Sequence, residues 1–402
     1  MAPRLLIIHT LDWPNAARLA MAFAAADCQV HVLCRAGHPV RAVSSVQRVY
    51  RLNLFAPLRS IRDAIIEADP HFIIPCDDAA AAHLHHLYRQ ERRSSAGAVT
   101  PIAALIDHSL GDCAAHEQLA TRSRLGPIAH AAGVTLPQTD VILSLDELRQ
   151  WTAREGFPAV VKTDRSWGGE GVAIIRSPRQ AEQAYGAMSR LPSLVRVLKR
   201  ILINGDPNLY VRRFVDPFNT ITVQKFIHGR IANASLACWK GVAIGSLGVE
   251  VVAAYGATGA GTVVHPVENP QMLQAAERIV GLLGISGFCG FDFILEQETE
   301  RAYLIEINPR ATQINHLVLG AGHDLPGALR ARIAAEPQRE ACPVTDLETI
   351  ALFPQEWERD HNSVFLTNAY HDIPREEPAF VQACLKSPSS RRRPERFANL
   401  RN

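Results

Sequence analysis

The stretch "GFDFILEQETERAYLIEINPR", residues 290–310, has the pattern of two apolar strands joined by a polar turn. Side chains alternate between the two faces of a strand, so Glu306 and Asn308 point to the same face. With the turn centred on Thr299, Asp292 and Glu306 are equally far from it and lie opposite one another. Three oxygen-bearing side chains are therefore predicted to converge on one face of the hairpin.

Two carboxylates that face each other on an apolar hairpin cost free energy when both are ionised. A hard divalent cation removes that cost, because Mg²⁺ binds carboxylate and carbonyl oxygens together with phosphate oxygens. Arg310, two residues beyond Asn308, adds a guanidinium that can bind phosphate or developing negative charge. The competing interpretation is an edge hairpin with a solvated polar face, which would not require the Asn-Pro-Arg ending.

A second motif, "FPAVVKTDRSWGGEGVAII" at residues 157–175, combines a lysine with three glycines. Lys162 ends an apolar strand, Gly168, Gly169 and Gly171 follow it, and the chain then returns to a strand pattern. Glycine lets backbone N–H groups approach an anion closely. A P-loop would need GxxxxGK[ST] leading into a helix, which is absent. The motif therefore predicts a hairpin whose tip folds over phosphates as a lid.

The first part of the chain alternates strand and helix patterns, as in "RLLIIHT", "NAARLAMAFAAAD" and "CQVHVLC". This alternation predicts a parallel sheet covered by helices. The GxGxxG fingerprint is missing after the first strand, so we expect no dinucleotide site there. Thr10, Asp12, Asp77 and Asp78 stand at strand ends, where they either face a ligand crevice or cap helices, the commoner role.

The composition excludes several classes of protein. A length of 402 residues indicates more than one domain, and a net charge of +2 argues against a general nucleic-acid binder. The eight cysteines form no CxxC pair, which favours a reducing cytoplasm without a disulfide framework. We expect no membrane span, because no apolar run reaches about 18 residues, and the first apolar run is too short for a signal peptide.

Taken together, these motifs resemble the ATP-grasp superfamily across roughly residues 115–335. The 157–172 segment is similar to its phosphate-binding strand and mobile glycine-rich loop. "VQKFIHG", residues 223–229, is similar to the hinge whose backbone binds adenine, and residues 290–310 are similar to its metal-binding strands. The resemblance implies an α/β protein, α+β in its catalytic part, with an ATP-grasp fold behind a Rossmann-like parallel-sheet domain.

The implied domain organisation has five parts. They are a Rossmann-like domain (1–111), the central and lid part with the glycine-rich loop (112–225), the C-terminal ATP-grasp part with the metal site (226–335), a C-terminal extension (336–386) and a disordered basic tail (387–402).

The resemblance also implies roles for individual residues. Lys162 would contact the α- and β-phosphates, and Arg122 would be the second basic contact, with Arg124 a close alternative. Lys162 and Arg310 would act in catalysis, with Arg310 meeting the transferred phosphoryl group. The remaining nucleotide contacts would be Ser166, Gly168, Gly169 and Gly171 in the lid and Gln224, Lys225 and Ile227 around the adenine. The ligands of Mg²⁺ or Mn²⁺ would be Asp292, Glu306 and Asn308.

One departure concerns the ribose. Many members place an acidic residue just after the hinge glycine to bind ribose hydroxyls, whereas this chain has Arg230 and Ile231. This difference leaves the ribose contact unassigned and indicates a divergent subgroup.

The implied reaction begins with ATP phosphorylating a carboxylate to an acylphosphate. An amine then displaces phosphate, which gives ADP and an amide-like bond between small molecules such as amino acids. The alternatives are a bicarbonate-phosphorylating carboxylase or carbamoyl-phosphate-synthase-type enzyme, and a nucleotide-binding protein without turnover. We expect ATP, a carboxylate and an amine as partners, no nucleic acid and no membrane, and a homodimer stays open as an assembly.

Overall fold

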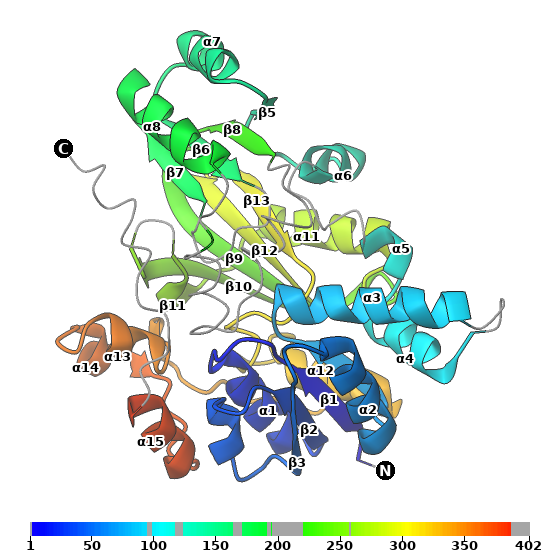
Figure 1. The fold of residues 1–402 in the computed structure, drawn as a ribbon. Helices are drawn as coiled ribbons and strands as arrows, with labels where there is room; N and C mark the ends of the chain where they lie inside the picture. Colours follow the sequence, from blue (N-terminus) through cyan, green and yellow to red (C-terminus); the bar gives the residue numbers. More distant parts are fainter. Residues whose placement is uncertain are drawn as a thin grey trace.

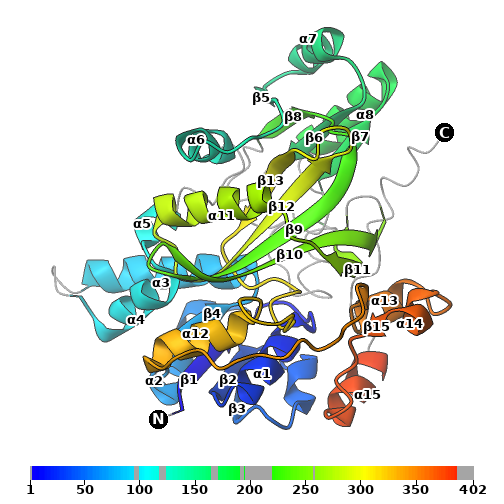
Figure 2. The ribbon, with the colours of Figure 1, turned by 180° about the vertical axis from the view of Figure 1, so that it is seen from behind.

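The computed structural model describes residues 2–94, 99–116, 124–163, 171–190, 194, 220–256 and 259–386. Its first sheet has four parallel strands in the order β3-β2-β1-β4 (Figure 1, with β4 labelled in Figure 2). These are β1 (Arg4–Ile8), β2 (Gln29–Cys34), β3 (Arg48–Arg51) and β4 (Phe72–Pro75), and the helices are α1 (Asn15–Ala25), η1 (Pro39–Ala42), α2 (Pro57–Ala68), α3 (Asp78–Ser94) and α4 (Pro101–Leu110).

Successive side chains of β1 point to opposite faces of this sheet, and both faces are buried. Leu5 and Ile7 belong to the core that contains Phe23 of α1, whereas Leu6 and Ile8 belong to the core that contains Ile61 of α2. A parallel sheet needs such cover on both faces, because its crossover helices pack on either side. The predicted helix-covered parallel sheet is thereby confirmed.

The central sheet has seven strands in the order β13-β12-β9-β10-β11-β14-β15. The strands are β9 (Gly229–Trp239), β10 (Val242–Ala254), β11 (Gly261–Pro266), β12 (Gly287–Glu296), β13 (Ala302–Asn308), β14 (Ile350–Ala351) and β15 (Tyr370–His371). Helix α11 (Pro270–Leu283) covers one face, and α12 (Leu325–Ala334) lies on the other side (Figure 2). Leu236 and Ala237, neighbours on β9, accordingly belong to different cores.

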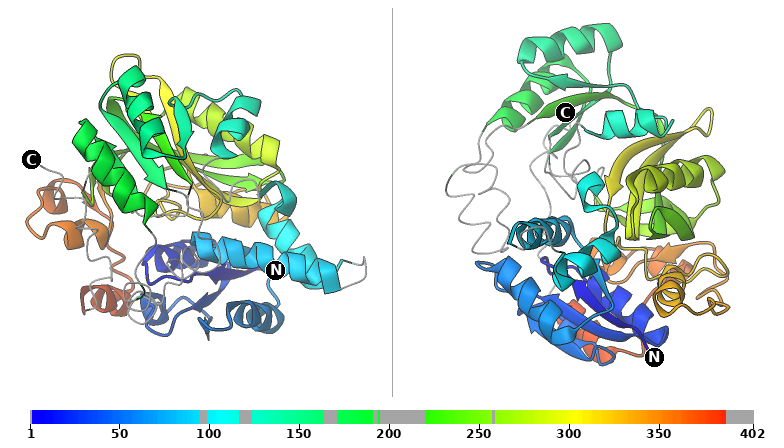
Figure 3. Two further views of the ribbon diagram at one scale, coloured as in Figure 1. Left: turned by 45° about the horizontal axis from the view of Figure 1, so that its top comes forward. Right: turned by 90° about the vertical axis from the view of Figure 1, so that its right-hand side faces the viewer.

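The third sheet is antiparallel, in the order β5-β8-β6-β7, and stands at the opposite end of the molecule from the first sheet (Figure 3). Its strands are β5 (Thr139–Ile142), β6 (Ala159–Thr163), β7 (Val172–Ile175) and β8 (Ile221–Lys225), with helices α5 (Cys113–His116), α6 (Leu125–Ala131), α7 (Leu145–Glu155) and α8 (Pro178–Ser189) nearby in sequence. Leu148 and Trp151 of α7 pack with Val161 and Val223 in one core, so α7 covers one face of this sheet.

The segment beyond α12 joins the central sheet and also contacts helix α1 beside the first sheet. Strand β14 pairs with β11, and β15 pairs with β14, so this segment extends the central sheet. It also contains α13 (Gln355–Arg359), α14 (Phe365–Asn368) and α15 (Pro378–Lys386). Buried Asp372 accepts a hydrogen bond from Arg18 of α1 and contacts His316 Nε2 at 2.7 Å. The predicted tail, 387–402, lies outside the described residues.

No helix in the described part of the chain is long and apolar enough to cross a membrane.

Candidate functional site

The β12–β13 hairpin brings the predicted carboxylates together. Asp292 pairs directly with Glu306 across the two strands, as the sequence predicts, and a register shift follows between Asp292 and Phe293. Asn308 Nδ2 donates a hydrogen bond to Asp292 Oδ2 at 3.3 Å. Gly290, opposite Asn308, has no room for a side chain, because a Cβ there would lie 2.3 Å from Thr312 Cγ2. Asp292, Glu306 and Asn308 therefore form one cluster against a closely packed backbone.

A fourth side chain, which the sequence analysis did not identify, completes this cluster. Asn233 stands opposite Asp292 on β9, and its Nδ2 donates to Asp292 Oδ1 at 2.6 Å. Each oxygen of Asp292 thus accepts a hydrogen bond from an asparagine amide. The sequence alone gives little indication of Asn233, because only the pairing of β9 with β12 brings it next to Asp292.

The electrostatics of the hairpin favour a bound cation. Burial, and then the neighbouring Glu306 carboxylate, raise the pKa of Asp292 to about 6, although Arg310 and the two asparagine amides partly oppose this. Within the described residues, no three His, Cys, Asp or Glu side chains gather as metal ligands. The donor set is therefore two carboxylates and an amide oxygen, which suits Mg²⁺ or Mn²⁺ better than metals that prefer sulfur or imidazole ligands.

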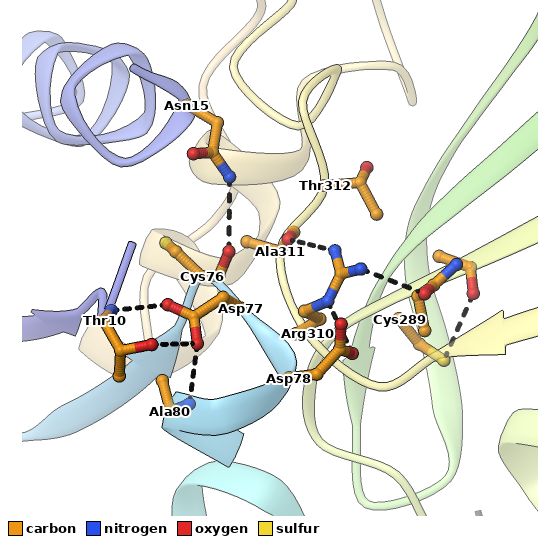
Figure 4. Close-up of polar contacts among 12 residues, drawn as sticks. Thr10, Asn15, Cys76, Asp77, Asp78, Ala80, Cys289, Arg310, Ala311 and Thr312 are labelled. Carbon is orange, nitrogen blue, oxygen red and sulfur yellow. Dashed lines mark hydrogen bonds and ion pairs between the residues drawn. The ribbon is translucent and has the colours of Figure 1, made fainter. Parts of the chain in front are cut away.

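Arg310 links the hairpin to the first domain (Figure 4). Its Nε lies 2.8 Å from Asp78 Oδ1, Nη2 donates to Asn308 Oδ1 at 3.1 Å, and Nη1 donates to the Ala311 carbonyl at 3.3 Å. Burial lowers the pKa of Arg310, but the neighbouring carboxylates of Asp78, Asp77 and Glu306 together raise it overall. The guanidinium therefore stays charged beside the candidate metal ligands.

The polar residues at the strand ends of the first sheet differ in their partners. Asp77 is buried, accepts a hydrogen bond from Thr10 Oγ1 at 2.8 Å and accepts another from the Ala80 N–H at 2.8 Å, so it caps the start of α3 (Figure 4). Asp12 forms an ion pair with Arg35 at 3.1 Å. Asp78 alone of the predicted four contacts the hairpin.

The residues expected at the phosphates and adenine lie on the third sheet. Lys162 and Gln224 share one face by register, whereas Val161 and Val223 face the core under α7. Gln224 is buried, and its Nε2 donates to Thr139 Oγ1 at 3.0 Å. Lys162 and Gln224 thus lie on the face turned away from α7.

Residues 226–228 connect β8 of the third sheet to β9 of the central sheet. The Phe226 and His228 rings contact each other edge to face, with centroids 4.9 Å apart. Ile227 between them is buried, and Lys225 at the end of β8 is exposed. The segment that resembles the adenine-binding hinge is therefore the link between two sheets.

The lid is only partly within the described residues. Gly171 has a φ of +73°, which favours glycine, and its carbonyl accepts a hydrogen bond from the Thr163 N–H at 2.9 Å. Arg122, Ser166, Gly168 and Gly169 lie outside the described residues.

Arg230, where an acidic residue is common in the superfamily, does not stand alone. It forms ion pairs with Glu250 on β10 at 2.9 Å and with Glu300 in the β12–β13 turn at 2.6 Å. Two carboxylates therefore balance its charge, and the ribose contact is still unassigned.

A sequence model described as an ATP-grasp domain matches residues 130–313 of the chain. The chain therefore contains an ATP-grasp domain, matched over slightly less than half of its length. The matched range contains Lys162, the hinge and the whole β12–β13 hairpin, so the three motifs that carry the resemblance all fall inside this ATP-grasp domain.

Curated relatives include carbamoyl phosphate synthases. The arginine-specific large chain from Geobacillus stearothermophilus is 25% identical over 224 residues, which cover 53% of this chain and 20% of the relative. The N-terminal section of the large chain from Methanopyrus kandleri is 28% identical over 207 residues, covering 49% of this chain and 32% of the relative. The similarity thus spans a third or less of these relatives.

Solved structures share this fold over most of the chain. The biotin carboxylase domain of Hydrogenobacter thermophilus 2-oxoglutarate carboxylase has a TM-score of 0.56 at 17% identity, covering 84% of this chain and 71% of that chain. An N5-carboxyaminoimidazole ribonucleotide synthetase has a TM-score of 0.57 at 13% identity, with coverage of 86% and 80%. L-amino acid ligase from Bacillus licheniformis has a TM-score of 0.56 at 16% identity, with coverage of 82% and 75%.

Proposed function

We propose that this protein is an ATP-dependent ligase that phosphorylates a small-molecule carboxylate and couples the acylphosphate to an amine. The observation that carries the proposal is the facing pair Asp292 and Glu306, with Asn308 and Arg310 beside it, inside the ATP-grasp domain. A carboxylate pair that is costly without a cation, next to a fixed guanidinium, suits the transfer of a phosphoryl group.

ATP and Mg²⁺ are the proposed cofactors. Similar structures are complexes with MgADP, for the 2-oxoglutarate carboxylase domain, and with ADP, for the carboxyaminoimidazole synthetase. In this chain Asp292, Glu306 and Asn308 would hold the cation, which when bound would neutralise charge on the phosphates. Lys162 would contact the α- and β-phosphates from the third sheet.

The residues of this chain would act mainly by positioning and by charge. Three N–H groups of Arg310 are engaged by Asp78, Asn308 and Ala311, and a guanidinium has five, so donors remain for the transferred phosphoryl group. A carboxylate oxygen is a poor leaving group, and phosphorylation makes it a good one. The amine then completes the reaction, and ADP and phosphate leave.

A bicarbonate-phosphorylating activity is the second candidate. Curated relatives that match the chain include carbamoyl phosphate synthases, and one similar structure is a carboxylase domain in complex with bicarbonate. The likeness to L-amino acid ligase favours the first candidate. Both candidates use the same metal and phosphate residues and differ in the acceptor of the phosphoryl group.

The test is ADP release by the purified protein with ATP and Mg²⁺ across amino acids and amines, with a parallel arm containing bicarbonate. Glu306→Gln should abolish the activity, whereas Glu298→Gln, an exposed residue in the turn of the same hairpin, should retain it. ADP release only with bicarbonate would select the second candidate. ATP binding without turnover in any arm would refute both candidates and support a nucleotide-binding protein. Full activity of Glu306→Gln would refute the site.

A further inference from the structure

A continuous chain of hydrogen bonds joins the candidate metal ligands to the first domain. It begins at Asn233 Nδ2, which donates to Asp292 at 2.6 Å, and continues through Asn308 Nδ2, which donates to the same carboxylate at 3.3 Å. Asn308 Oδ1 accepts from Arg310 Nη2 at 3.1 Å, and Arg310 Nε donates to Asp78 Oδ1 at 2.8 Å. The chain therefore ends on a carboxylate that lies 232 residues from Arg310 in sequence.

The contact with Asp78 fixes the plane of the Arg310 guanidinium. Within its own segment, the Arg310 side chain donates to Asn308 Oδ1 and to the Ala311 carbonyl, both within two residues of it. Asp78 is the partner that reaches it from another part of the fold. Because the guanidinium is planar, holding Nε in one place also aims Nη1 and Nη2. The carboxylate of Asp78 thereby directs Nη2 at Asn308 Oδ1.

The backbone beside Asp78 is fixed by contacts on both sides of the Asp78–Arg310 pair. Asp78 is the first residue of α3, directly after Asp77, which caps that helix. The Ala311 N–H donates to the Pro75 carbonyl at the end of β4 at 3.0 Å, so the chain after β13 is docked on the same corner of the first domain. The Asp78 side chain is 33% exposed and that of Arg310 is 13% exposed, which places the pair at the edge of the buried site.

We propose that Asp78 is a positioning residue of the ligase, through which the first domain sets the orientation of Arg310 for the transferred phosphoryl group. This inference rests on the proposed function. An acidic residue at a helix N-terminus also stabilises the helix. That purely structural role predicts a loss of stability without any specific effect on the γ-phosphate, so the two roles can be separated.

The first experiment compares nucleotide affinities by titration calorimetry with Mg²⁺, using AMP-PNP as the non-hydrolysable triphosphate and ADP as the diphosphate. In Asp78→Asn the Kd for AMP-PNP should rise about tenfold or more, whereas the Kd for ADP should change less than about twofold, because Arg310 meets only the third phosphate. Asp63→Asn, an exposed aspartate on α2, is the matched control and should change neither value. Equal weakening of both nucleotides by Asp78→Asn would overturn the proposal.

The second experiment is a double-mutant cycle with Arg310→Gln. If Asp78 acts through Arg310, Asp78→Asn should lower AMP-PNP affinity less than about twofold in the Arg310→Gln background. If the two substitutions instead lower the affinity for AMP-PNP by factors that multiply in the double mutant, the proposal is overturned. Asp78→Glu, which keeps the charge, should recover part of the affinity if Asp78→Asn folds poorly. Wild-type protein that binds AMP-PNP but releases no ADP refutes the proposed turnover alone, and the cycle still decides the role of Asp78.

Discussion

Replacing Asp292 by asparagine should change stability in a way that depends on pH. In the metal-free protein, burial and then Glu306 raise the pKa of Asp292 from 3.8 to about 6. The folded state therefore binds more protons than the unfolded state between these values, so the stability contributed by this group falls as pH rises. From about pH 5 to about pH 7.5, the difference amounts to about 1.5 kcal/mol.

The substitution also has a cost that does not depend on pH. Asp292 accepts hydrogen bonds from the amides of Asn233 and Asn308, and an asparagine would turn a second donor toward one of them. An unsatisfied buried donor costs about 1–3 kcal/mol. The sign of the stability change at a single pH is therefore open, but this term cancels when two pH values are compared.

The assay is thermal unfolding in EDTA at about pH 5 and about pH 7.5, for wild type, Asp292→Asn and the surface control Asp63→Asn. Relative to wild type, Asp292→Asn should gain about 2 °C in Tm between the lower and the higher pH. Asp63→Asn controls for the loss of a surface carboxylate. A Tm difference between Asp292→Asn and wild type that is the same at both pH values would refute the reasoning that burial and the facing Glu306 carboxylate raise the pKa of Asp292.

Three further predictions concern the binding of Mg²⁺, the role of Lys162 and the buried ion pair of Asp372. Mg²⁺ with ADP should stabilise the wild type, by about 2.7 kcal/mol at a hundredfold excess over Kd, and thermal shifts should show that Glu306→Gln loses most of the Mg²⁺-dependent part. Lys162→Ala should raise the Kd for ATP about tenfold or more in calorimetry, because a charge opposite the phosphates is lost, with little change in Tm. Asp372→Asn should cost about 3 kcal/mol, since it leaves Arg18 buried without its charge partner, and urea unfolding with exposed Asp346→Asn as control would measure this.

The sequence predicted strand pairing residue by residue only where the two strands are close along the chain. The β12–β13 hairpin could be paired residue by residue, because its turn fixes the register of Asp292 and Glu306. Strands β9 and β10 were not identified, and glycines in β10 weaken the strand pattern. Gly248 is required there because a Cβ would lie 2.5 Å from the Val267 carbonyl oxygen. Strands β14 and β15 have two residues each, too few for any pattern.

The residues of the candidate site could likewise be predicted together only where they are close in sequence. Asp292, Glu306, Asn308 and Arg310 stand on one short stretch and were predicted together. Asn233 reaches the site only through the pairing of β9 with β12, and Asp78 only through the docking of the first domain on the central sheet. No local pattern encodes a contact of that kind, because it depends on how whole sheets pack.

The hairpin also shows how the fold can maintain a candidate binding site whose two facing carboxylates lower its stability. Phe291 and Phe293, on either side of Asp292, are fully buried in the core under α11, and they hold β12 in place. The apolar face therefore fixes the strand while the opposite face keeps Asp292 and Glu306 paired across the hairpin, a local conflict that a cation would resolve. The same packing explains why Asp292 cannot move away from Glu306 to relieve the repulsion: a shift of one residue in register would expose both phenylalanines. The free energy of the buried core thus maintains the charge pair on which the proposed chemistry depends.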